Sequence, residues 1–108
     1  MNKKNLISAL VLSCLTWAVQ AQGTAYPNKP IRLVVGFAPG GAADYVARAM
    51  SDAMGKALGQ TVIVENRAGA GSSIAAENVA KAAPDGYSVL LASPSSISVN
   101  PALNPKLN

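Results

Sequence analysis

The chain has 108 residues, of which 50% are hydrophobic and 13% are charged, with nine basic and five acidic side chains. A chain of this length forms one domain at most. It contains no histidine and a single cysteine, so it offers no ligand cluster for a metal ion and few groups for acid–base catalysis. The formal net charge of +4 falls to +2 when the first 21 residues are set aside. We therefore expect neither a cofactor nor a nucleic-acid partner.

The first 21 residues have the layout of a secretory signal peptide. Two lysines precede an apolar run from Leu6 to Val19, and a small-residue cleavage site ends at Ala21. The run is shorter than the roughly 20 residues that cross a bilayer as a helix. Cys14 lies in a sequence like a lipoprotein processing box, but the apolar run continues beyond it, which argues against a lipid anchor. We predict a cleaved leader over residues 1–21 and a mature part over residues 22–108 without cysteine.

The mature part begins with a strand, a glycine-rich turn and a helix. Ile31 to Val35 is almost continuously apolar, which is typical of a parallel strand buried on both faces. A helical period follows from Ala42 to Leu58, and a glycine directly after it is a natural stop. Within this helix Val46, Met50 and Met54 recur every four residues and predict the buried face.

Two more strands and one more helix are predicted after this. Residues 61–64 indicate a second strand, and residues 65–71 indicate a loop. Ser72 or Ser73 can cap a second helix that runs to about Ala83, and a third strand over residues 87–92 follows a Pro-Asp-Gly turn. The remainder, residues 97–108, shows no clear period.

This alternation predicts an α/β fold with a three-stranded parallel sheet of order 2-1-3 and flanking helices. Right-handed crossovers place the first strand in the centre. In such sheets ligands bind beyond the carboxyl ends of the strands, where the strand order reverses. Three loops should converge there, over residues 37–44, 66–73 and 93–96. We call these three loops the rim.

The first rim loop suits an anion, because its glycines let a ligand approach the unpaired amides of a helix start. Gly36 to Gly41 has the spacing of a Walker A loop, but alanines stand where the lysine and the serine or threonine belong. Asp44 is expected at the third helical position, paired with Arg48 and facing the positive end of the helix. Its carboxylate can also accept hydrogen bonds from loop amides or from ligand-bound water.

The other polar and aromatic residues near the rim each have a structural and a functional interpretation. Arg67 could pair with a carboxylate, although loop arginines are more often solvated or structural. Tyr45 and Tyr87 are expected to pack rather than to form a stacking platform. Four serines can act either as caps and turn residues or as ligand donors, and we expect at least one on the ligand: Ser72, Ser93, Ser95 and Ser96.

Several long blocks of the sequence, in order, resemble one family of receptors. They are Tyr26-Pro27-Asn28-Lys29-Pro30-Ile31-Arg32-Leu33-Val34-Val35, Phe37-Ala38-Pro39-Gly40-Gly41, Val64-Glu65-Asn66-Arg67-Ala68-Gly69-Ala70-Gly71, Ala80-Lys81-Ala82-Ala83-Pro84-Asp85-Gly86-Tyr87 and Asn100-Pro101-Ala102-Leu103. These blocks are similar to those of the tripartite tricarboxylate transporter substrate-binding proteins, the Bug receptors.

The resemblance implies a periplasmic receptor with two α/β lobes and a ligand cleft between them. Such receptors capture a di- or tricarboxylate, or a related organic acid, and deliver it to the membrane subunits of a transporter. In the family, loop amides, small hydroxyl groups and ordered waters hold the ligand. Carried over position by position, the candidate contacts are Phe37, Ala38, Pro39, Gly40, Gly41, Ala42, Asp44, Ala70, Ser72, Ser93, Ser95 and Ser96.

Some positions depart from the family pattern. Members often have proline in place of Gly36, serine or threonine in place of Ala43, and glycine in place of Ser72, so the identity of the ligand stays open. Family chains are also far longer, which indicates that residues 22–108 form the N-terminal part of the first lobe.

Two other functions stay open at this point. One is a secreted α/β enzyme whose catalytic residues lie beyond the C-terminus, and the other is a remnant that binds nothing. No G-x-S-x-G elbow and no acid pair with catalytic spacing occur in the sequence. We therefore expect a receptor rather than an enzyme.

Overall fold

The structure is a computed structural model that describes residues 25–104, and its centre is a three-stranded parallel sheet. The strands are β1 (Ile31–Val35), β2 (Val62–Asn66) and β3 (Ser88–Leu91), in the order β2-β1-β3. Ile31 pairs with Val62 at one end and Val35 pairs with Asn66 at the other. The predicted α/β class and strand order are confirmed, while the predicted leader lies outside the described residues.

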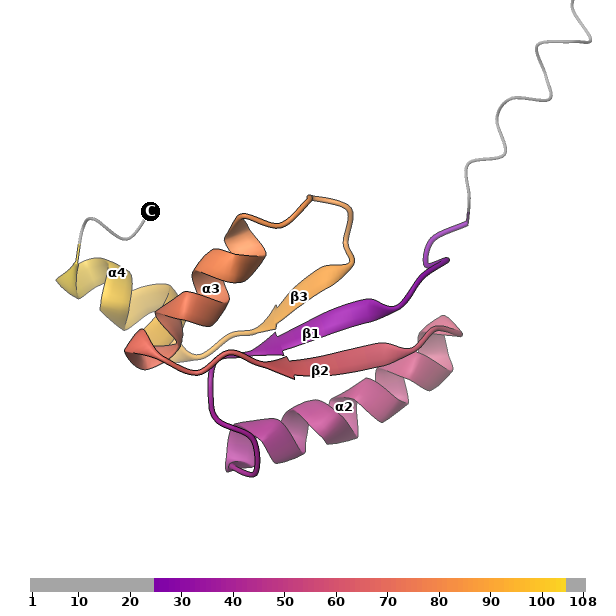
Figure 1. Cartoon of the computed structure of the whole chain (residues 1–108), viewed down its shortest axis with the longest axis horizontal. Coiled ribbons are helices and arrows are strands. Elements are labelled where there is room, and N and C mark those ends of the chain that lie inside the picture. The colour runs from indigo at the N-terminus through magenta and orange to yellow at the C-terminus, as the bar shows by residue number, and fades with distance from the viewer. Residues whose placement is uncertain (1–24, 105–108) are drawn as a thin grey trace, which may run out of the picture.

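One helix covers each face of the sheet (Figure 1). Helix α2 (Ala42–Leu58) packs through Ala47 on Leu33 and Val35. Arg32 points to the opposite face, because side chains alternate along a strand, and it donates a hydrogen bond to Asn78 in α3 (Ser73–Ala80). β1 is the buried centre of this three-layer arrangement, with Leu33, Val34 and Val35 at most 2% exposed.

Helix α2 has the predicted bounds, but its buried face is not the predicted one. Val46 and Met50 are 47% and 41% exposed, whereas Ala47 and Ser51 are buried. The small side chains allow the helix to lie close to the sheet, and Ser51 satisfies its hydroxyl by donating to the carbonyl of Arg48. The helix ends at Leu58, and the predicted stop residue Gly59 follows it with a φ of 65°, in the left-handed region.

Several other predicted boundaries are wrong, and β3 is one residue shorter at each end than the predicted 87–92. β2 starts one residue later and extends two residues further than predicted, because Glu65 and Asn66 pair with Val34 and Val35 of the central strand. α3 ends at Ala80 rather than Ala83, where the Ala82 amide donates to the carbonyl of Val79 and the chain tightens into a turn. The segment without a clear period begins with helical turns, η2 (Ser95–Val99) and α4 (Asn100–Leu103).

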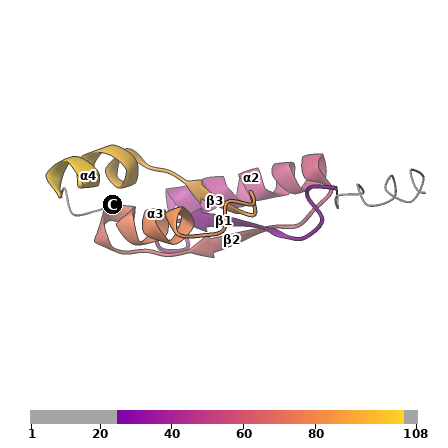
Figure 2. The ribbon, with the colours of Figure 1, turned by 90° about the horizontal axis from the view of Figure 1, so that it is seen from above.

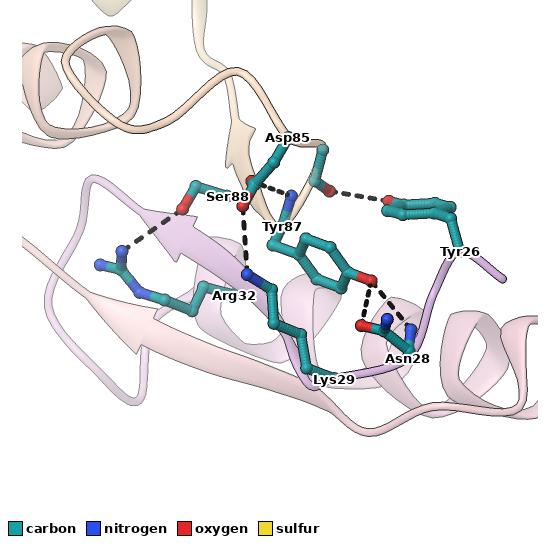
Figure 3. A network of polar contacts seen from close by, with 8 residues as sticks. Tyr26, Asn28, Lys29, Arg32, Asp85, Tyr87 and Ser88 are labelled. Carbon is teal, nitrogen blue, oxygen red and sulfur yellow. Dashed lines mark hydrogen bonds and ion pairs between the residues drawn. The ribbon is translucent and has the colours of Figure 1, made fainter. Parts of the chain in front are cut away.

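The amino ends of the strands are joined by a polar network (Figure 3). Tyr26 donates to the carbonyl of Gly86, and its ring meets the ring of Tyr87 edge to face at 5.0 Å. The Tyr87 hydroxyl accepts from the Asn28 amide and donates to the Asn28 side chain, so Tyr87 is a packing residue as predicted. This network ties the segment before β1 to the turn before β3 and leaves the opposite end of the sheet open to the rim.

Candidate functional site

All three rim loops lie at the carboxyl ends of the strands, as the strand order predicts. Figure 1 shows the start of α2 on one side of the sheet and α4 on the other, both beyond the tips of the arrows, and Figure 2 shows α4 at the same end from above. The short helix η1 (Ala70–Ser72) contacts η2. Residues 37–42 of the first loop are exposed, and Phe37 is 41% exposed. Gly40 has a φ of 88°, a backbone conformation that a residue with a Cβ rarely adopts.

Asp44 organises the first rim loop from inside. It is only 5% exposed and occupies the predicted third helical position after Gly41. One carboxylate oxygen accepts from Arg48 Nε and from the Gly40 amide, each at 3.0 Å, and the other accepts from Asn66 Nδ2 at 3.0 Å. The Arg48 guanidinium, then the Gly40 amide and Asn66, lower the pKa of Asp44 to about 2. Asp44 is therefore ionised at neutral pH, and Arg48 balances its charge.

This arrangement changes which amides can receive a ligand. The Gly40 N–H, a predicted contact, already has an internal acceptor in Asp44. The first amides of a helix have no intrahelical acceptor, and at Gly41 no side chain caps α2 to supply one. The groups that suit an anion here are therefore the amides that follow Gly41, beginning with that of Ala42.

Asn66 connects two of the rim loops, a role that the sequence analysis missed. Its side-chain amide donates to the Phe37 carbonyl at 3.1 Å as well as to Asp44. Asn66 is the last residue of β2, and the carboxyl end of a strand next to the central one was a visible signal for this position. By holding Phe37 and Asp44 together, Asn66 sets the shape of the first rim loop.

The second rim loop has an unusual backbone. Gly69, Ala70, Gly71 and Ser72 all have positive φ angles, and two of them are not glycine. Ser72 precedes α3 with a φ of 72° and makes no side-chain cap, contrary to the predicted capping role. Non-glycine residues in this region carry strain, and such strain clusters at ligand sites and switches.

Asn100, which lies later in the chain, forms hydrogen bonds with the second rim loop. The sequence analysis did not name it as a site residue. Its Nδ2 lies 2.9 Å from the Gly71 carbonyl, 3.2 Å from the Ala70 carbonyl and 2.8 Å from Ser73 Oγ. An amide group has two hydrogens, so two of these three bonds can be satisfied at once. Asn100 thereby connects α4 with the second rim loop.

The third rim loop is held together by its serines. The Ser93 hydroxyl lies 2.9 Å from that of Ser95 and 3.2 Å from that of Ser96, and Ser96 donates to the Ser93 carbonyl. Ser93 and Ser95 are half-buried, whereas Ser96 is 5% exposed. Ser95 and Ser96 also begin η2, a π-type turn, which is a conformation often found at functional sites.

Of the other residues predicted to contact the ligand, most are exposed and one is buried. Ala38, Pro39, Gly41, Ala42 and Ala70 are exposed on the rim, whereas the Ser72 side chain is 1% exposed. Ligand contact by any of them stays a prediction. Arg67 donates a hydrogen bond from Nε to a carboxylate oxygen of Glu65 at 2.6 Å. This contact favours a structural role for Arg67 over a ligand contact. Tyr45 is 78% exposed, so the prediction that it packs is wrong.

Of two hollows on the surface, one is remote from the rim and the other borders it. A groove of about 670 Å³ lies at the far end of α2, lined by residues that include Asp52, Lys56 and Gln60. A smaller one of about 270 Å³ borders the second rim loop at Ala70 and runs between α3 and α4. Over residues 25–104 no group of three or more metal-ligating side chains occurs, and no helix is long and apolar enough to span a bilayer.

Known proteins resemble this chain in both sequence and structure. A family model described as tripartite tricarboxylate transporter family receptor matches residues 46–108. An Agrobacterium vitis protein, described as a UPF0065 protein in the TAR-I ttuE-ttuC' intergenic region, is 48% identical over 84% of this chain and 26% of its own length.

Two solved structures from Rhodopseudomonas palustris also match. MatC with bound malate is 43% identical, with a TM-score of 0.71 over 76% of this chain and 28% of its own. Rpa4515 with adipate is 36% identical, with a TM-score of 0.62 over 64% of this chain and 23% of its own. The chain therefore spans about a quarter of the length of each of these three relatives.

Proposed function

Because the chain belongs to the tripartite tricarboxylate transporter receptor family, we propose that it forms one wall of the ligand cleft of a periplasmic solute receptor. The ligand is a small organic acid with two or three carboxylates. The receptor delivers this acid to the membrane subunits of a tripartite transporter. The leader over residues 1–21 would direct the protein out of the cytoplasm.

The convergence of the three rim loops carries this proposal. The first loop offers amides at the start of α2, and the third offers the hydroxyls of Ser93 and Ser95. Such neutral donors suit a carboxylate, because a helix start favours negative charge and hydrogen bonds to charged groups are strong. Pairing of Asp44 with Arg48 means that the buried acid adds no uncompensated negative charge.

The relatives support the ligand class. Malate and adipate, bound to two of the structural relatives, are both dicarboxylates. They differ in length and in the hydroxyl group of malate, so relatives of one architecture accept different acids. A receptor function accounts for these loops without any catalytic group, which favours it over the enzyme and remnant alternatives.

Isothermal titration tests the proposal. The full-length mature receptor that carries this sequence would be titrated with malate, adipate and citrate, and with glucose as an uncharged control. We expect saturable heat from at least one of the three acids and none from glucose. Absence of heat from all three acids, in a receptor that unfolds cooperatively, would contradict the proposal.

A further inference from the structure

Asn100 joins two of the three rim loops, the second and the third. Its backbone amide donates to the carbonyl of Ser95 in the third loop. Its side chain reaches the second loop, where Nδ2 lies 2.9 Å from the Gly71 carbonyl and 2.8 Å from Ser73 Oγ. One residue therefore connects loops that are separated by 27 to 29 positions of the chain.

The π-type turn η2 sets the direction of the Asn100 side chain. The hydrogen bond from the Asn100 amide to the Ser95 carbonyl spans five positions, one more than in an α-helix. Each residue of an α-helix is rotated by about 100° from the one before it. With one residue fewer in the turn, position 100 would be rotated by about that angle, and its side chain would no longer face the second rim loop.

The second rim loop has a backbone that needs such support. Residues 69–72 all have positive φ angles, with 46° at Ala70 and 72° at Ser72. Strained conformations of this kind persist only when the surrounding structure holds them. The Asn100 side chain also packs closely on this loop, because a Cβ added to Gly71 would lie 2.9 Å from Asn100 Nδ2. Asn100 is therefore part of the structure that holds the strained loop.

From these contacts we infer that Asn100 is a positioning residue for the ligand, which fixes the second rim loop relative to the third before the acid binds. Asn100 does not touch the acid and acts through the backbone of residues 69–72. This inference rests on the proposed function. A receptor whose binding-competent conformation is only partly populated binds more weakly by that fraction. Loss of the Asn100 amide should therefore weaken the binding of every acid by the same factor.

The affinity test uses the full-length receptor and three variants of Asn100, titrated with malate, adipate and citrate. Asn100→Ala removes the side chain, and Asn100→Leu keeps a side chain of similar size without a donor. We expect about tenfold weaker binding in both variants, by a common factor for every acid that the unmodified receptor binds. Asn100→Gln retains an amide donor on a longer side chain and should recover part of the affinity.

Tyr26→Phe is the matched control, because it removes one hydrogen bond between distant segments, to the Gly86 carbonyl, at the opposite end of the sheet. It should lower Tm and leave every affinity within twofold. Hydrogen exchange in the unloaded receptor then reports on the loop itself. The Ser72 amide donates to the Gly69 carbonyl within the second rim loop. Its exchange should be about fivefold faster in Asn100→Ala and unchanged in Tyr26→Phe.

The outcomes separate the positioning role from the proposed function. If the unmodified receptor binds none of the acids, the proposed function fails, and the positioning role fails with it. If the receptor binds an acid and both Asn100→Ala and Asn100→Leu bind it within twofold of the same affinity, the positioning role alone is overturned. A loss confined to one of several bound acids would also overturn it, because such selectivity indicates direct contact with the ligand.

Discussion

At the scale of single residues, Asp44 connects folding with the candidate site. It lies in the first turn of α2 with its charge balanced by Arg48, and its partners come from the first loop, the helix and β2. An ionised carboxylate with three hydrogen bonds holds the rim loop in one conformation. The solute is therefore expected to meet amides whose positions are set before it arrives.

The pH dependence of the stability of an Asp44 variant tests this role. The pKa of Asp44 is lowered to about 2 in the folded protein from 3.8, chiefly by Arg48. Its ionised form therefore contributes stability above about pH 4, and this contribution is lost as the pH falls through about 2. Asp44→Asn should lower Tm by several degrees at pH 7, and this difference should shrink towards pH 2. Thermal unfolding of both proteins across this range gives the result, and a difference that does not depend on pH would contradict the role.

Sequence reasoning located most of the rim but not the contacts that shape it. The strand order followed from the strand–helix alternation, and with it the end of the sheet at which the loops meet. The contacts of Asn66 and Asn100 depend on side chains that meet across 22 to 30 positions of the chain, which no local pattern encodes. The left-handed backbone at Ser72 was likewise hidden, because serine before a helix is ordinarily a cap.

At the scale of elements, α2 shows what periodicity can and cannot predict. Its bounds followed from the proline–glycine turn before it and Gly59 after it. Its buried face did not, because the larger apolar residues Val46 and Met50 stay at the surface while Ala47 contacts the sheet. Close approach of helix and strand favours small side chains, and the four-residue period of larger ones is a misleading signal here.

The packing of α2 predicts different effects for two leucine substitutions. Ala47 is fully buried against Leu33 and Val35, so Ala47→Leu should cost about 1–3 kcal/mol through overpacking. Ala49 is exposed on the same helix, and Ala49→Leu should change the stability by at most about 0.5 kcal/mol. Urea unfolding of the two variants measures the difference, and equal midpoints would show that α2 packs on another face.

The first turn of α2 can be tested with a matched pair of added charges. Ala42 is exposed at the first helical position, where an aspartate favours the helix but repels an approaching carboxylate. Ala42→Asp should retain Tm and weaken binding of the preferred acid at least tenfold. Ala53→Asp adds the same charge at an exposed mid-helix position and should leave the affinity within twofold. Titration calorimetry measures both affinities. Equal affinities of the two variants would show that the acid does not bind at the start of α2.

At the scale of the whole molecule, the described residues form a sheet with a rim that is open on one side. Apolar side chains are exposed on the sheet, with Ile63 at 49% and Val89 at 36% exposure, and on α3, with Ile74 at 48%. We expect further protein to cover these side chains. The chain spans about a quarter of its relatives, so the remainder of such a receptor is the proposed cover and second wall.

The 108-residue chain alone should therefore be a poor receptor. We expect it to bind malate, adipate and citrate more weakly than about 1 mM, because a single wall supplies only part of the contacts. We also expect it to increase the fluorescence of the apolar dye ANS, whereas the full-length receptor should not. Micromolar binding of any of these acids by the isolated chain would contradict the expectation.

The most direct measurement is a crystal structure of the full-length receptor with the acid that titration shows to bind most tightly. The account predicts a carboxylate within hydrogen-bonding distance of the amides that follow Gly41, facing the third rim loop. A solute bound instead beside the Tyr26–Tyr87 network, or in the groove at the far end of α2, with the first-turn amides facing water, would contradict it.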